Sequence, residues 1–456
     1  MSARRLLAQR ALLPGGWARD VAIGIDADGN IDDVAIDAAD AAGERVDGPL
    51  VAAMPNVHSH AFQRALAGRT GRASTQRDDT FWTWRQAMYA FLDRLDADAF
   101  EAVAAQAYVE MAKAGYATVA EFHYVHHDAL GKPYTDPAEL AWRIVAAAQA
   151  AGLGLTLLPV FYAHGGFGAT PTTASQRRFL HSPLTFSRLL ESLTAGLASR
   201  NVVLGVAPHS LRAVTAEELG QVVRMAPEGA PIHIHAAEQT REVDECFAAT
   251  RMRPVEWLLT QANIDARWCV VHATHMTERE VAGLAKSGAV VGLAPTTEAD
   301  LGDGTFPAEP FAAAGGRFAI GSDSNTVIDP FAELRQLEWS QRLRHRRRNV
   351  LAPTSGEPVG AALWTRCAHE GARALGRRTG AIIAGARADL VVLDTRDPAL
   401  TGQHEGDVLD AAIFGPSRRP VRDVMSAGEW IVRDGRHPRE DEVADRYRAV
   451  LAAVTT

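Results

Sequence analysis

Two histidines separated by one residue are the first group in the chain that could do chemistry. His58-Ser59-His60 follows an apolar run at residues 50–54. In extended backbone, residues i and i+2 point to the same side, so both imidazoles can bind one metal ion. A polar turn is the alternative for such a pair. Its position directly after a strand-like run favours the metal site.

A second polar group follows the run at residues 232–235. His235 ends this run and can be a third ligand, while Glu238, three residues further on, can carry a proton over the ion without binding it. We interpret His233, two residues earlier, as a hydrogen-bonded histidine of the interior. The H-x-x-E spacing therefore predicts a ligand and a proton carrier from one strand end.

Two more residues complete the candidate site. His272 ends the run at residues 269–272, and Asp323 follows the run at residues 318–321. Asp323 supplies a carboxylate where a fourth ligand or a general base is needed, although an aspartate here could also cap a helix. Because all these residues stand at strand ends, we expect one shared site.

The elements that must position these residues alternate regularly. Eight apolar runs of strand length lie at residues 50–54, 117–122, 155–161, 202–206, 232–235, 269–272, 289–293 and 318–321. Amphipathic helical patterns, such as residues 100–113 and 278–286, separate them. This alternation predicts an α/β fold, a parallel (β/α)8 TIM barrel whose chemistry lies at the C-terminal strand ends. An open doubly wound sheet alternates similarly, but no G-x-G-x-x-G follows the first run.

The two ends of the chain lie outside this alternation. Residues 1–48 and 380–456 carry strand and turn patterns without crossover helices. We expect them to pair as one small β-sandwich domain, leaving residues 49–379 as the catalytic barrel domain.

Composition excludes several classes of function. Net charge is −8, which argues against a nucleic-acid or anionic-membrane binder. Three separated cysteines cannot form a disulfide framework or a thiolate zinc site, so we expect a reducing, cytoplasmic compartment. Residues 144–176 carry no charge, but Gly152, Gly154 and Pro159 break any membrane span. The basic run at residues 342–348 is interpreted as a solvated helix end or a subunit contact.

The order of the motifs resembles the amidohydrolase superfamily, over nearly the whole chain. The H-x-x-E after the fifth strand is similar to the mononuclear deaminase type, although Glu121 keeps a binuclear site open. The resemblance implies one Zn²⁺, or Fe²⁺ or another divalent ion, bound by His58, His60, His235 and Asp323. It further implies that Asp323 is the base, that His272 orients the attacking water, and that Glu238 shuttles protons during hydrolytic deamination.

The loops at the barrel mouth are similar to those of the superfamily branch that hydrolyses N-formimino-L-glutamate in histidine degradation. This resemblance implies a small-molecule dicarboxylate amidine as substrate, ammonia as product and a homodimer. It places five residues on the substrate, with the arginines on its carboxylates: Gln63, Arg85, Tyr124, His209 and Arg212.

Two alternatives remain open. One is a ring deaminase of the same superfamily, of the guanine, cytosine or adenosylhomocysteine type. Arg212 argues against it, since a neutral ring offers a guanidinium no partner. The other is a metal-bearing barrel without turnover, against which the set of Glu238, His272 and Asp323 argues.

Overall fold

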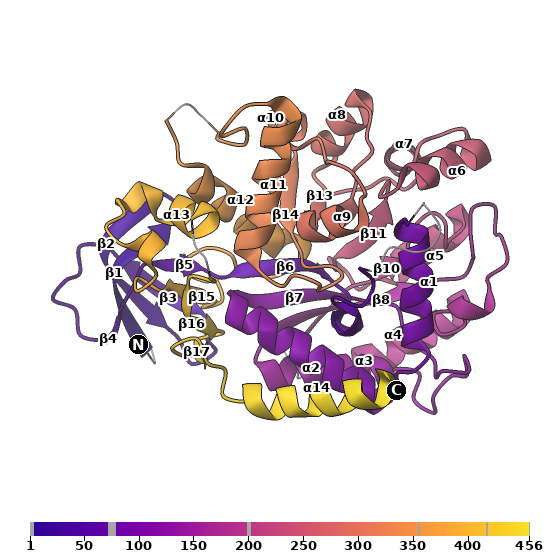
Figure 1. The fold of residues 1–456 in the computed structure, drawn as a ribbon, viewed down its shortest axis with the longest axis horizontal. Coiled ribbons are helices and arrows are strands. Elements are labelled where there is room, and N and C mark those ends of the chain that lie inside the picture. Colours follow the sequence, from indigo (N-terminus) through magenta and orange to yellow (C-terminus); the bar gives the residue numbers. More distant parts are fainter. Residues whose placement is uncertain (1–3, 72–78, 198–201, 354–355, 416–417, 456) are drawn as a thin grey trace.

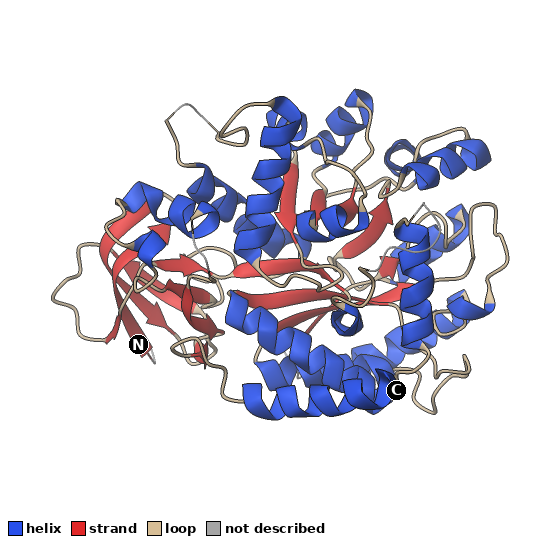
Figure 2. Cartoon of the chain, in the orientation of Figure 1, coloured by secondary structure: helices blue, strands red, loops and turns tan. Residues whose placement is uncertain are grey.

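The computed structural model describes residues 4–71, 79–197, 202–353, 356–415 and 418–455. Its centre is a set of parallel strands surrounded by helices (Figures 1 and 2). These strands are β6 (Met54–Ser59), β7 (Tyr116–His123), β8 (Gly154–Phe161), β9 (Val202–Leu204), β10 (Ala207–Pro208), β11 (Ile232–Ala236), β12 (Trp268–His272), β13 (Val290–Leu293) and β14 (Arg317–Ile320).

The central strands close into a ring. One parallel sheet runs β10-β8-β7-β6, with β9 also paired to β8, and a second runs β11-β12-β13-β14. Parallel bridges join the two sheets at Ser59 with Asp323 and at Val206 with Ile232. Since β9 and β10 lie along the same neighbour, they form one interrupted strand, and the ring has the eight positions of the predicted barrel.

Helices follow most of these strands and cover the outside of the barrel (Figure 2). They are α1 (Phe81–Leu92), α2 (Ala97–Ala114), α3 (Glu139–Ala151), α4 (Pro183–Leu197), α5 (Ala216–Met225), α6 (Thr240–Thr250), α7 (Pro254–Gln261), α8 (Glu278–Ser287), α9 (Pro295–Leu301), α10 (Ala308–Ala313), α11 (Pro330–His345) and α12 (Val359–Ala374). The short 3-10 turn η1 (Ala61–Leu66) follows β6. As predicted, the basic run includes a helix end, because α11 stops at His345.

The first predicted barrel strand is corrected. Residues 50–54 do not form one strand of the barrel: β5 (Leu50–Ala52) pairs with strands of the terminal segments, and β6 begins at Met54. The chain passes from one sheet to the other at Ala53, whose N–H donates to the carbonyl of Asp389.

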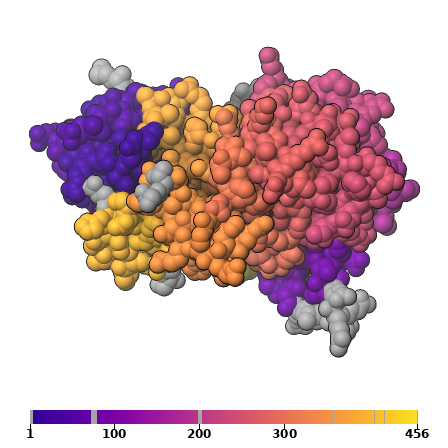
Figure 3. Space-filling model, turned by 90° about the horizontal axis from the view of Figure 1, so that it is seen from above, coloured from indigo at the N-terminus to yellow at the C-terminus, as the bar shows by residue number. Residues whose placement is uncertain are grey.

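Both ends of the chain build the second sheet, as expected. Its strands are β1 (Arg4–Leu13), β2 (Gly16–Ile25), β3 (Ile31–Ala35), β4 (Glu44–Val46), β5, β15 (Leu390–Leu393), β16 (Val421–Ser426) and β17 (Glu429–Val432). They follow the order β17-β16-β15-β5-β1-β2-β3, with β4 on β1. By hydrogen bonding this is one continuous sheet, not the two sheets of the expected sandwich. The N-terminal and C-terminal segments that form this sheet lie together at one end of the molecule (Figure 3).

The C-terminal segment also contains helices that the strand and turn patterns do not predict. They are α13 (Val408–Phe414) and α14 (Glu440–Thr455). Helix α14 lies along α2 (Figure 1), where Lys113 pairs with Glu440 at 2.5 Å and Arg446 with Glu101 at 2.7 Å. The last residues therefore pack on the barrel. Among the described residues, no helix is long and apolar enough to cross a membrane.

Candidate metal and substrate site

Three histidine nitrogens meet at the mouth of the barrel. Nε2 of His58 lies 3.2 Å from Nε2 of His60 and 3.1 Å from Nε2 of His235. Within the described residues, these three side chains form the one group of His, Cys, Asp or Glu with metal-ligand spacing. Tetrahedral Zn–N bonds of about 2.0–2.1 Å place ligand nitrogens about 3.3 Å apart, so this spacing fits a zinc ion.

The protonation of the rings fits the same ion. Nδ1 of His60 lies 3.1 Å from the carbonyl of Phe122, and Nδ1 of His235 lies 3.1 Å from the carbonyl of His209. Because a carbonyl only accepts, both Nδ1 atoms carry the proton, and both Nε2 atoms keep a free lone pair. Burial, with repulsion between the rings, holds the pKa of His58 and His235 well below the usual range, and burial lowers that of His60 to about 3. The neutral donors that a metal requires are in place.

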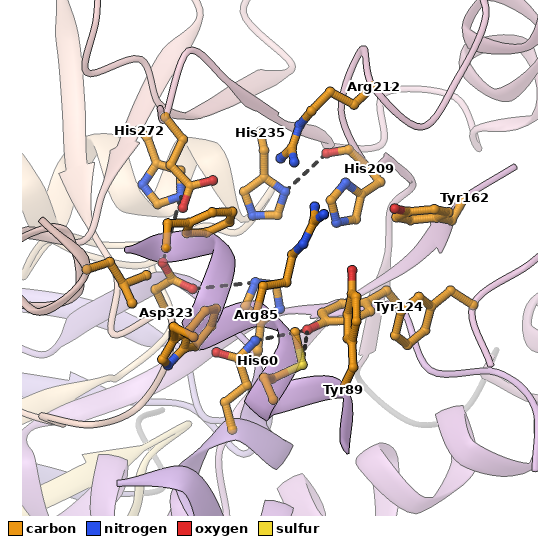
Figure 4. A pocket seen from close by; sticks show the side chains of 17 residues that line it. His60, Arg85, Tyr89, Tyr124, Tyr162, His209, Arg212, His235, His272 and Asp323 are labelled. Atoms are coloured by element: carbon orange, nitrogen blue, oxygen red, sulfur yellow. Dashed lines mark hydrogen bonds and ion pairs between the residues drawn. The ribbon is translucent and has the colours of Figure 1, made fainter. Parts of the chain in front are cut away.

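Asp323 borders the three histidines. Its Oδ1 lies 3.4 Å from Nε2 of His60 and 3.7 Å from Nε2 of His58, while its Oδ2 lies 3.7 Å from Nε2 of His272. Burial raises the pKa of Asp323 to about 7. One carboxylate therefore faces both the candidate ligands and the neighbouring His272, as Figure 4 shows.

His272 joins the candidate proton-transfer groups. Its Nε2 also lies 3.8 Å from Oε1 of Glu238. Burial acts to lower the pKa of His272, but Glu238, Glu298 and Asp323 together raise it to about 10. The backbones of His272 and Asp323 have φ of +68° and +44°, in the left-handed region that such residues seldom adopt. Strain of this kind at both strand ends is typical of a functional site.

Glu298, in α9, is a site residue that the sequence motifs do not indicate. Its Oε1 lies 3.3 Å from Nδ1 of His272 and accepts the N–H of Ala294 at 3.0 Å. A carboxylate on Nδ1 fixes the proton there and orients the ring. The only signal in the sequence is an acidic residue just after the seventh barrel strand.

Hydrogen bonds hold the first and last barrel strands together beneath the site. Nδ2 of Asn56 donates to Oγ of Ser322 at 2.7 Å, and Nδ2 of Asn325 donates to the carbonyl of His60 at 3.0 Å. Gly321 permits this approach, since a Cβ there would lie 2.6 Å from the backbone nitrogen of His58. The geometry of the H-x-H motif thus depends on the strand-eight loop.

Two other polar residues of the barrel face elsewhere. Nε2 of His233 lies 2.8 Å from the carbonyl of Ala374, which confirms His233 as a hydrogen-bonded interior histidine. Oε1 of Glu121 accepts the N–H of Ala61 at 2.8 Å, and burial raises its pKa to about 7. Glu121 does not belong to the three-histidine group, so the binuclear alternative finds no support in this geometry.

A cavity opens above the histidines. It brings together all five residues expected on the substrate: Gln63, Arg85, Tyr124, His209 and Arg212. Figure 4 shows Arg85 and Arg212 pointing toward one another across this space. Glu238, His272 and Asp323 line the inner end of the same cavity. Among the described residues, neither arginine forms an ion pair or a hydrogen bond with another group.

Polar atoms in the cavity wall also lack partners. Arg212 is 8% exposed, and its Nε has no hydrogen-bond partner in the described part of the chain. Oε1 of Gln63 is likewise buried without a partner, while its Nε2 donates to Oη of Tyr124 at 2.9 Å. Buried donors and acceptors of this kind are costly unless a ligand satisfies them.

Sequence reasoning missed several aromatic residues of the wall. Tyr89 on α1 and Tyr162 after β8 both line the cavity, as do Trp84 and Phe179. The helical period of α1 alone could indicate that Tyr89, four residues after Arg85, faces the same way. No local pattern indicates Tyr162 or Phe179, because they stand in loops that only the fold brings to the site.

Comparison with known proteins gives the family. Residues 50–431 match the model of the amidohydrolase family, and residues 4–48 match "Formimidoylglutamate deiminase HutF, N-terminal domain". The chain is 49% identical over 446 residues to the formimidoylglutamate deiminase of Pseudomonas aeruginosa, which covers 98% of each chain. It is 29% identical over 408 residues to a 5-methylthioadenosine/S-adenosylhomocysteine deaminase of Haloarcula marismortui, with 88% of this chain and 85% of the relative covered.

Solved structures agree. An amidohydrolase from Brucella melitensis superimposes with a TM-score of 0.93 and 46% identity, covering 99% of this chain and 100% of the other. A zinc-bound adenosine deaminase from Xanthomonas campestris, at 22% identity, shares the fold with a TM-score of 0.80, covering 99% and 98%. These matches confirm the resemblance inferred from the motifs: the chain belongs to the amidohydrolase family.

Proposed function

We propose that this chain hydrolyses N-formimino-L-glutamate to N-formyl-L-glutamate and ammonia, with Zn²⁺ bound by His58, His60, His235 and Asp323. The observation that carries this proposal is the charge pattern of the cavity. Arg85 and Arg212, which form no ion pair with a carboxylate in the described part of the chain, stand opposite an inner end lined by carboxylates. A substrate with two carboxylates and a cationic amidine matches both ends.

The inner end of the cavity supplies the chemistry. A zinc ion at the histidines would lower the pKa of a water molecule toward about 7 and so provide a nucleophile at neutral pH. Asp323 accepts the proton of the attacking water at Oδ2, and Nε2 of His272 orients that water by hydrogen bonding. Glu298, which accepts the N–H of the other ring nitrogen, favours the protonated ring of His272 and holds its orientation.

Glu238 carries protons on the substrate side. It is 5% exposed and stands three residues beyond His235, at the cavity wall. Its carboxylate accepts from the imino N–H of the cationic amidine as water adds to the formimino carbon, and Glu238 then passes the proton released by the water to the departing nitrogen. The C–N bond breaks, and ammonia leaves. His209 lies beside the reacting group, and Gln63 with Tyr124 borders the space below it.

A deaminase of adenine-type rings is the second candidate, favoured by the relatives that act on 5-methylthioadenosine and S-adenosylhomocysteine. The pair of arginines separates the candidates, because 5-methylthioadenosine and guanine have no carboxylate and S-adenosylhomocysteine has one, whereas N-formimino-L-glutamate has two. We expect ammonia release from N-formimino-L-glutamate, and at most trace release from S-adenosylhomocysteine, 5-methylthioadenosine or guanine. Comparable turnover of any of these rings would refute the proposal.

Metal analysis tests the zinc assignment separately. We expect about one equivalent of zinc per chain, and two tightly bound equivalents would contradict the mononuclear site. The expected homodimer stays a prediction, which light scattering in solution tests.

A further inference from the structure

One indole ring at the rim of the cavity is surrounded by three arginines. The ring centroid of Trp82 lies 4.6 Å from Cζ of Arg85, 5.7 Å from Cζ of Arg212 and 4.4 Å from Cζ of Arg241. Trp82 and Arg85 belong to α1, Arg212 follows β10, and Arg241 stands in the first turn of α6. A single side chain thus connects three separate elements at the cavity mouth.

The three cations differ in what else they contact. Arg241 is the outer one: its side chain is 61% exposed and pairs with Glu245 at 2.6 Å. Arg85 and Arg212 line the cavity, and in the described part of the chain no carboxylate forms an ion pair with either. The face of an aromatic ring holds a guanidinium without using its N–H donors. Both inner arginines therefore keep their donors available to a ligand.

Trp82 does not line the cavity as Phe81 and Trp84 do. Its contacts with the two cavity-lining arginines point to a role through them. Two guanidiniums directed at one space repel each other, so without a support they would separate toward solvent. The indole of Trp82 lies against both.

We propose that Trp82 is the positioning residue for the dicarboxylate preference of this site: it holds Arg85 and Arg212 so that both reach one ligand. The inference rests on the proposed function. It assigns the two carboxylates of the proposed substrate to a preformed pair of guanidiniums. A preformed pair loses less conformational freedom on binding than two free arginine side chains. The alternative is that Trp82 merely anchors the first turn of α1.

Binding of glutarate tests this proposal without turnover, because glutarate has the two carboxylates and no reacting group. We expect calorimetry on the zinc-loaded protein to give a Kd about tenfold higher for Trp82→Leu than for the unmodified chain, consistent with loss of one or two cation–π contacts. Trp82→Phe keeps an aromatic face and should restore most of the affinity. The Trp82→Leu change should weaken the binding of butyrate, which has one carboxylate, less than it weakens the binding of glutarate.

The matched control is Trp339→Leu. Trp339 lies on α11 and is 43% exposed, and Cζ of Arg335 lies 5.8 Å from its ring centroid. The substitution therefore removes a similar Trp–Arg contact away from the cavity. We expect its glutarate affinity to equal that of the unmodified chain. If Trp82→Leu fails to fold, Trp82→Met, which also removes the aromatic face, takes its place: about a tenfold loss of glutarate affinity supports the proposal, and unchanged affinity overturns it.

A double-mutant cycle separates positioning from anchoring. In an Arg212→Met background, Trp82→Leu should weaken glutarate binding much less than in the unmodified chain, because its partner is already lost. Fully additive losses, or unchanged binding by Trp82→Leu, would overturn the proposal. Failure of the proposed function looks different: the unmodified chain itself would then neither bind glutarate nor release ammonia from N-formimino-L-glutamate.

Discussion

Replacing Arg212 by methionine is the change that most clearly separates substrate binding from structural support. Methionine keeps much of the volume and removes the charge. Arg212 is 8% exposed, and its Nε has no partner among the described residues. Its main electrostatic neighbours are the carboxylates of Glu242 and Glu238, which act to raise its pKa against burial.

The size of the effect follows from these surroundings. A charge-assisted hydrogen bond between buried groups contributes about 1.5–3 kcal/mol, which corresponds to a rise in KM of roughly 10- to 150-fold. The unfolding free energy should fall only modestly, since Arg212 forms no ion pair among the described residues but its charge offsets those of Glu242 and Glu238. We therefore expect much weaker binding with at most a small loss of stability.

Steady-state ammonia release from N-formimino-L-glutamate measures KM and kcat, and urea unfolding measures stability. Arg335→Met, which removes an arginine on the far side of α11, serves as the control. A KM for Arg212→Met within twofold of the unmodified chain would refute the assignment of Arg212 to a carboxylate. A raised KM together with a large loss of stability would instead indicate a structural role.

Further predictions concern the metal and the proton-transfer groups. His60→Ala should abolish bound zinc, measured by elemental analysis, and retention of a full equivalent would contradict its role as a ligand. Glu238→Gln should keep zinc and KM but lower kcat by about 10²–10⁴-fold, as expected for a proton carrier; a kcat within threefold would argue against that role. Glu298→Gln should lower kcat by about 10–100-fold at unchanged KM, because His272 loses its orienting carboxylate; an unaltered kcat would exclude this. Gly321→Ala should cost about 1–3 kcal/mol in urea unfolding, since its Cβ would collide with backbone atoms, and full stability would contradict the close strand approach.

Alternation of strands and helices was enough to predict the barrel. Seven of the eight predicted runs lie mainly in barrel strands, because buried parallel strands have short apolar sequences that glycines and helices separate. The prediction for the remaining run, residues 50–54, was wrong for a physical reason. Residues 50–54 form one uninterrupted apolar run, and no turn residue marks Ala53, where the chain changes sheets.

The residues of the candidate site also fall into two groups, those that the sequence predicts and those that it does not. His58, His60, His235, His272 and Asp323 could be predicted because strand ends converge by the rule of the fold. Glu298 and Tyr162 could not, because each acts through a contact between distant loops. The contacts of Trp82 also depend on tertiary structure, since Arg212 and Arg241 are far from it in the chain.

Product analysis with labelled substrate tests the central claim most directly. The zinc-loaded chain is incubated with N-formimino-L-glutamate carrying ¹⁵N in the imino group, and the products are identified by NMR and mass spectrometry. The mechanism predicts ¹⁵N-ammonia and unlabelled N-formyl-L-glutamate in equal amounts. Formation of ¹⁵N-formamide and free glutamate, or no turnover by a chain that deaminates S-adenosylhomocysteine, would contradict it.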